Sequence, residues 1–325
     1  MNLGAVEQIA DAVLYEGYIL YPYRLSAVKN QQRFNFGVLY PREYCDLQPG
    51  SESSEMRTEC LLQGSSSTTI EVKVRFLQMV VGQPILAAAG FQPALFDGAD
   101  VNYRHSFQEG RERDVSTPTL SLESIAANPY RQEFVFTDGE NTEALQGELE
   151  LETLQLGEGL FRLKLSVRNV ARLEGANNLS RDHVLLRSLA SVHSILYAAG
   201  GEFVSSLDPP ESLKSAAAEC QNTGCWPVLA GDQGQRNLVL SAPIILYDYP
   251  QIAPESPGDL FDGTEIDEIL ALRILTMTDA EKLEVRNGDD RARRILERTE
   301  MLPPEHFQKL HGALRSLRAS PEGPQ

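Results

Sequence analysis

The sequence contains none of the short motifs that identify common catalytic sites. It has no Walker A sequence, no glycine fingerprint of a dinucleotide-binding fold, no G-x-S-x-G and no H-E-x-x-H. Of its five histidines, His183 and His193 are ten residues apart and do not share a helix face, and His306 and His311 are a poor ligand pair. We therefore expect neither a metal ion nor another cofactor.

A concentrated basic patch is also missing. The chain has 29 Lys and Arg against 46 Asp and Glu, a formal net charge of −17. Such a chain is repelled by phosphate backbones and by anionic lipids. The most basic stretch, residues 286–298, interleaves arginines with acids, which is typical of a solvated helix face. We expect no nucleic-acid partner.

Membrane and secretion signals are absent as well. No window reaches 18 consecutive apolar residues, which predicts no direct membrane insertion. The first twelve residues carry Glu7 and Asp11 and no basic stretch, unlike a signal peptide. We expect a cytoplasmic protein. In that compartment the four cysteines are free thiols by default. Cys220 and Cys225 are spaced more loosely than a C-x-x-C pair, so a buried bystander role is favoured over a zinc site or a disulfide.

The composition that remains is that of a folded protein. Hydrophobic residues make up 42% and charged residues 23%, enough to bury a substantial core. Residues 68–81 alternate apolar and polar side chains, which predicts a half-buried strand. Residues 148–153 and 160–170 predict a hairpin whose outward acidic and basic side chains pair across the strands. Strands are also predicted at 34–40, within 51–67 between Ser-rich loops, at 133–137 and at 237–247 with an interruption at Pro243.

Helical periodicity is found at both ends and once in the middle. Residues 6–14 predict a short amphipathic helix, residues 177–196 a helix capped by Ser180, and residues following Pro210 a short helix to about Cys220. Near the C-terminus, helices are predicted at 265–277, from the capping box at Thr278 onward, and from Pro304 to about Leu317.

These elements predict an α+β fold with a β-rich antiparallel body, interspersed helices and a helical C-terminal segment. We divide the chain into a body at 1–250, a proline-rich linker at 251–263, a helical segment at 264–318 and a disordered tail at 319–325.

Two segments are candidates for binding a partner protein. The first has four tyrosines within nine residues, 15–23, followed by cations, and its proposed contact residues are Tyr18, Tyr21, Tyr23 and Arg24. Tyrosine provides large contact area with a polar tip, which suits an interface. The alternative is that these rings pack over the β-rich core.

The second candidate is Tyr247, Asp248 and Tyr249, which precede a run of acids through Glu268. The acids could bind a basic partner surface or a hard cation, although their order differs from an EF-hand loop. They are also favoured at helix N-termini through the helix dipole, which explains them without any ligand.

The stretches YEGYILYPYR, FNFGVLYP and especially SAPIILYDYPQIAPESPGDLFDGTEIDEILALRIL resemble an uncharacterised bacterial family. Its genes lie beside those for high-affinity, oxygen-tolerant [NiFe] hydrogenases and their maturation factors. The resemblance extends over about residues 5–299. It implies an accessory role in hydrogenase assembly, cofactor delivery or complex stability, and it supplies no catalytic residues. The missing C-x-x-C pairs speak against direct metal handling.

Three functions compete. We favour a non-catalytic accessory or assembly factor that binds a [NiFe] hydrogenase subunit or a maturation partner. The alternative is an enzyme of unrecognised type, a hydrolase or ligand-processing maturation factor, with a site assembled from distant residues such as His193, Cys220, Cys225 and Asp248. A structural subunit of a larger assembly is the third, and it predicts a large apolar interface.

Overall fold

The computed structural model describes residues 3–15, 36–81, 108–137, 144–251, 277–286, 293, 296–297 and 299–301. Its contacts divide the chain into two compact units. The first comprises Met1–Leu20 and Arg33–Gln251, and the second comprises Tyr21–Gln32 and Ile252–Gln325. Within the second unit, helix α8 (Asp279–Arg286) is described, and Lys282 and Arg286 both pair with Glu300.

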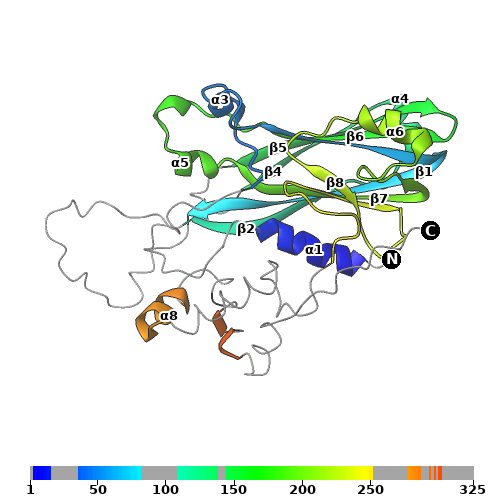
Figure 1. The fold of residues 1–325 in the computed structure, drawn as a ribbon. Helices are drawn as coiled ribbons and strands as arrows, with labels where there is room; N and C mark the ends of the chain where they lie inside the picture. The colour runs from blue at the N-terminus through cyan, green and yellow to red at the C-terminus, as the bar shows by residue number, and fades with distance from the viewer. Residues whose placement is uncertain are drawn as a thin grey trace, which may run out of the picture. The chain divides into compact units, whose positions relative to one another are not determined.

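The first unit is built around one very long strand, β1 (Glu55–Val81), of 27 residues. The sheet order is β4-β5-β6-β1-β7-β9-β8, and β2 and β3 also pair with β1. Every pairing is antiparallel. The remaining strands are β2 (Gln108–Ser116), β3 (Leu120–Ser121), β4 (Tyr130–Phe136), β5 (Leu145–Gly157), β6 (Leu160–Asn169), β7 (Leu189–Phe203), β8 (Trp226–Leu229) and β9 (Leu238–Ala242). Figure 1 shows β5 and β6 lying over β7 and β2.

The sheet folds over itself along β1. The N-terminal half of β1 pairs with β6, whereas its C-terminal half pairs with β2 on the same side. The register shifts between Gly64 and Thr69, where the strand changes partners. As a result Phe76 of β1 stacks on Phe134 of β4 with 5.6 Å between ring centroids, although the two strands are not paired. The main hydrophobic core lies in this fold between the two halves of the sheet.

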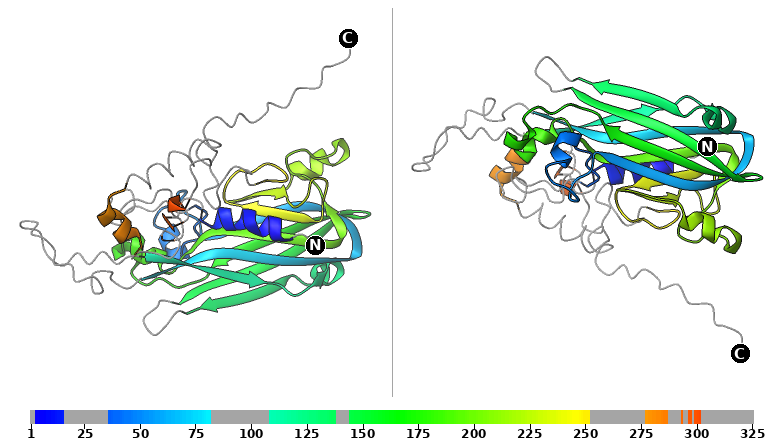
Figure 2. Two further views of the ribbon diagram at one scale, coloured as in Figure 1. Left: turned by 90° about the horizontal axis from the view of Figure 1, so that it is seen from below. Right: turned by 90° about the horizontal axis from the view of Figure 1, so that it is seen from above.

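Helix α1 (Leu3–Tyr15) covers the other face of β7, β8 and β9 (Figure 2). Its apolar residues Val6, Ala10 and Val13 pack on Ile195 and Leu240. At the rim of this contact α1 is tied to β1 by two ion pairs, Glu7–Lys73 and Asp11–Arg75. The predicted helix at 6–14 is therefore confirmed.

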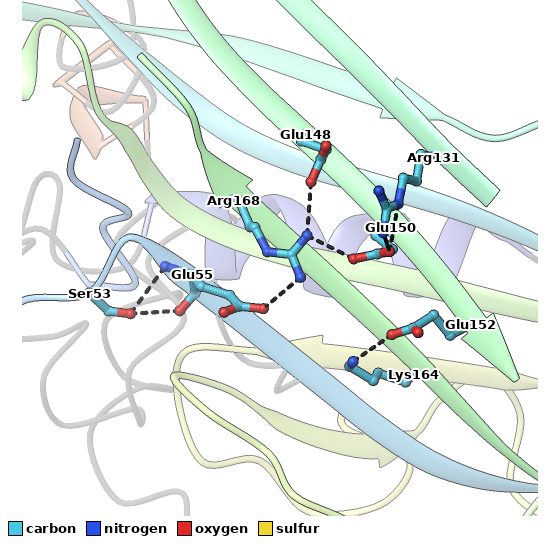
Figure 3. A network of polar contacts seen from close by, with 8 residues as sticks. All are labelled: Ser53, Glu55, Arg131, Glu148, Glu150, Glu152, Lys164 and Arg168. Atoms are coloured by element: carbon cyan, nitrogen blue, oxygen red, sulfur yellow. Dashed lines mark hydrogen bonds and ion pairs between the residues drawn. The ribbon is translucent and has the colours of Figure 1, made fainter. Parts of the chain in front are cut away.

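The outward face of β4, β5, β6 and the first half of β1 carries a ladder of charges. Arg168 contacts Glu148 and Glu150 on β5 and Glu55 on β1, and Lys164 contacts Glu152 (Figure 3). Burial alone would raise the pKa of Glu150, but hydrogen bonds from Arg168 and Arg131 outweigh it and the pKa is lowered. The predicted hairpin and its cross-strand charge pairs are confirmed.

The helix predicted at 177–196 is wrong over most of its length. Ser180 does cap a helix, since its side chain accepts from the His183 N–H, but α5 is only Arg181–Leu185. The chain then enters β7, a strand buried on both faces up to Leu196. Its continuous apolar run fits a central strand as well as a helix, so periodicity alone does not separate them.

Three further expectations need correction. Within 36–40 the structure has isolated bridges at Leu39 instead of a strand. The Ser-rich segment at 65–67, predicted as a loop, lies inside β1. The strand predicted at 237–247 ends at Ala242, before Pro243, as β9.

The short helices of the body pack at its periphery. The predicted helix after Pro210 is confirmed as the 3₁₀ turn η3 (Glu211–Leu213) followed by α6 (Lys214–Ala218). The others are α3 (Arg42–Cys45), α4 (Leu122–Ala127) and the 3₁₀ turn η2 (Ala176–Asn178). The helices predicted at 265–277 and from Pro304 onward, the linker at 252–263 and the tail at 319–325 lie outside the described residues.

Candidate protein-binding surface

Strand β8 is one edge of the sheet. It pairs with β9 on one side only, through Trp226↔Ala242, Val228↔Leu240 and Leu229↔Val239. An edge strand ordinarily leaves a row of unpaired backbone groups open to another chain. Pro227 has no backbone N–H, so one of the outward-facing donors of β8 is absent.

The remaining outward groups of β8 are occupied by two neighbouring segments. Ser206 donates its hydroxyl to the carbonyl of Pro227. The Leu229 N–H donates to Oδ1 of Asp248 at 2.8 Å, and the Leu229 carbonyl accepts from the Tyr249 N–H at 2.7 Å. The second oxygen of Asp248 accepts from the hydroxyl of Ser205. These bonds close the edge.

Tyr249 holds an unusual backbone conformation in this arrangement. Its φ is +56°, in the left-handed region of backbone conformation that residues other than glycine rarely adopt. The hydrogen bond to Leu229 and the packing of its ring against the main core hold it there. A strained backbone conformation of this kind persists only where several surrounding contacts hold it in place. The segment around Tyr249 is thus firmly fixed to the sheet.

The three segments joined by these bonds carry exposed apolar side chains. Tyr247 is 84% exposed and Ile245 is 73% exposed. The alternate residues Ile244 and Leu246 pack instead against the cluster that contains α1. Trp226 on β8 and Leu207 beside Ser206 are also exposed. We call the residues Leu207, Trp226, Ile245 and Tyr247 the clamp surface.

The predicted site residues fall into three groups. Tyr247 is available for contact. The Asp248 carboxylate is engaged within the chain, and Tyr249 is half-buried against the core. The four others, Tyr18, Tyr21, Tyr23 and Arg24, lie outside the described residues.

The residues proposed for a catalytic site are placed on different elements. His193 is buried on the α1 side of β7 opposite Arg75, with Nδ1 against the Ser191 carbonyl at 2.9 Å. Burial lowers its pKa to about 4. Asp248 lies at the β8 edge instead.

The two cysteines of that proposal are held by hydrogen bonds within the chain. Cys225 is buried in the main core, where its thiol contacts the Thr58 hydroxyl at 3.2 Å and the Arg57 carbonyl at 3.0 Å. Burial raises the pKa of both Cys220 and Cys225, which disfavours their thiolates. An open groove between residues 197–202 and 234–237 is lined by neither cysteine, nor by His193 or Asp248.

Three members of the clamp surface were missed by the sequence reasoning. Leu207 stands alone in a polar stretch, whereas Ile245 belongs to the apolar run that predicts a strand at 237–247, so neither context indicates an exposed contact residue. One signal was present: Trp226 is the only tryptophan of the chain and is followed directly by a proline. That dipeptide is typical of an edge strand.

Comparison with protein-family models gave no match, and comparison with curated proteins gave none. In the described ranges no helix is long and apolar enough to cross a lipid bilayer.

Proposed function

We propose that this protein is a non-catalytic accessory factor that binds another protein through the clamp surface. The observation that carries the proposal is the exposure of Tyr247 and Ile245 on a segment that Asp248 and Tyr249 fix to the sheet. Large apolar side chains on an ordered support lose little conformational freedom on binding, which favours affinity. Aromatic residues are also the commonest interface hot spots.

The proposed partner is a subunit of a [NiFe] hydrogenase or one of its maturation factors. The support for this class of partner is the resemblance of residues 241–275, a range that begins in β9 and includes the exposed segment. The net charge of −17 favours a partner with a basic rim around an apolar centre.

The test is affinity purification of the full-length tagged protein from the organism that encodes it, grown on hydrogen. Recovery of hydrogenase subunits is expected for the wild type. The double variant Ile245→Ser and Tyr247→Ala removes two exposed side chains that contribute little to folding. We expect it to reduce recovery at least tenfold.

Leu154→Ser is the matched control, because Leu154 is an exposed apolar residue on β5, away from β8. It should leave recovery unchanged. Recovery of hydrogenase subunits that is equal for the double variant would reject the clamp surface. Failure to recover them with wild-type protein would reject the partner.

A further inference from the structure

The opposite edge of the sheet, β4, is left open by the described part of the chain. Strand β4 pairs with β5 through seven consecutive residues, from Tyr130↔Leu151 to Phe136↔Leu145. No described residue hydrogen-bonds to its backbone from the side away from β5. Its sequence, YRQEFVF, contains neither proline nor glycine, and β4 has no bulge. Figure 2 shows β4 at the margin of the sheet, next to α4.

The outward face of β4 carries one charge, that of Glu133, without an ion-pair partner among the described residues. Arg131 pairs with Glu150 at 2.6 Å yet keeps 66% of its side chain exposed. Glu133 is exposed and stands directly opposite Glu148 of β5, and no cation within the described chain pairs with it. Like charges placed directly opposite in a sheet are destabilising. A cation supplied from outside the open edge would relieve this repulsion.

We infer that β4 is a homodimerisation edge at which two copies of the chain join their sheets in antiparallel register. A two-fold axis through Gln132 sets residue i opposite residue 264 − i of the second copy, and paired residues share a face. Arg131 then lies opposite Glu133 of the second copy, and this ion pair occurs twice. On the other face Tyr130 lies opposite Phe134 of the second copy.

A second copy is the proposed occupant because the edge is complementary to itself: the Arg131 of each copy lies opposite the Glu133 of the other. Shifting the axis by one residue in either direction places Glu133 or Arg131 opposite itself, so charge disfavours both neighbouring registers. Each copy carries a net charge of −17, which opposes association over long distances. At about 0.15 M salt that repulsion is screened beyond roughly 8 Å, while the paired Arg131 and Glu133 remain within range.

The experiment is sedimentation velocity of the full chain from 1 to 300 µM (about the range for a weak edge-to-edge dimer) at 0.15 M salt. The wild type is expected to shift from monomer to dimer. Glu133→Arg places two arginines opposite each other across the axis and should weaken the dimer at least tenfold. The same change replaces the repulsive contact with Glu148, so the fold is not threatened and loss of dimer cannot be ascribed to unfolding.

Glu158→Arg is the matched control, with the same charge change in the exposed β5–β6 turn, and it should dimerise like the wild type. Arg131→Glu mixed with Glu133→Arg should restore a heterodimer, because the first variant then carries two acids and the second two arginines on this edge, and both ion pairs form across the axis. A wild type that is monomeric throughout overturns the inference and leaves the edge to a strand of another protein. A Glu133→Arg variant that dimerises normally also overturns it.

Discussion

The two edges of the sheet differ in whether their outward backbone groups have hydrogen-bond partners. At β8 every outward backbone group is removed or occupied: Pro227 has no N–H, and Ser206, Asp248 and Tyr249 satisfy the rest. At β4 the described chain supplies no such groups. Folded proteins usually protect their sheet edges against unwanted pairing. The edge that the described chain leaves open is the one at which we propose that a second copy binds.

The closed edge also has a consequence for binding. Since β8 cannot accept another strand, a partner that meets this side must bind through side chains, and the clamp surface supplies the exposed ones. At β4 recognition would instead rest on backbone pairing, with Arg131 and Glu133 setting the register. The same sheet thus offers two different modes of recognition.

The largest expected effect comes from opening the closed edge. Asp248→Ala removes the acceptor of the Leu229 N–H and of the Ser205 hydroxyl, and we expect it to lower the free energy of unfolding by about 3 kcal/mol. It should also promote aggregation through the freed β8 edge. Urea unfolding and light scattering measure the two effects. Asp248→Asn, which keeps a carbonyl acceptor, should lose less than half as much stability.

The next largest effect is expected from removing Arg168, the cation that pairs with the acids of β5 next to β4. Arg168→Met leaves Glu148 and Glu150 without their shared cation, and we expect a loss of about 2 kcal/mol at pH 7, discounted for partial exposure. Because the pKa of Glu150 is lowered in the folded state, its contribution is full above about pH 5 and falls as the pH drops through that pKa. The gap between wild type and variant should therefore narrow in acid.

Urea titrations at pH 7, 5, 4 and 3 measure this gap. Lys164→Met, which breaks only the single, partly exposed pair with Glu152, is the control and should lose less than about 1 kcal/mol. A gap that widens toward pH 3 would contradict the assignment.

A smaller effect is expected from disturbing β4 without touching its charges. A Cβ at Gly147 would lie 2.1 Å from the Phe134 ring, so Gly147→Ala must displace this ring from its stack with Phe76. We expect a loss of about 1.5 kcal/mol, typical of overpacking. Gly157→Ala, where a Cβ meets nothing within 4 Å, should differ from wild type by less than about 0.5 kcal/mol. Thermal unfolding compares the two.

The smallest effect has the opposite sign. Glu133→Arg exchanges a like-charge contact with Glu148 for an attractive one and should stabilise the monomer by about 0.5 kcal/mol. The measurement is urea unfolding at low protein concentration, where no dimer contributes. A destabilised monomer would show that Glu133 has a partner within its own chain.

The hairpin of β5 and β6 was predictable because local alternation places Leu149 and Leu151 inward and the acids outward, and the turn glycines lie between the arms. Helix α1 was predictable for the same reason, with a period near 3.6. Strand β7 was not, because burial on both faces removes the alternation that distinguishes a strand from a helix.

The candidate site was predictable only in part. The sequence indicated the segment 247–249, but it did not indicate that Asp248 faces Leu229, nineteen residues away. Nor does the sequence of β4 reveal that this strand lies at an edge, since its position follows from long-range pairing order. Such contacts depend on the whole topology rather than on local pattern.

Amide hydrogen exchange of the full chain, at low and at high protein concentration, tests the contrast between the two edges most directly. We predict that the Leu229 amide is protected at both concentrations, because Asp248 occupies it. The β4 amides that do not bond to β5 should exchange rapidly in dilute protein and become protected in concentrated protein. Rapid exchange at Leu229, or β4 amides that are equally protected in dilute protein, would contradict the account.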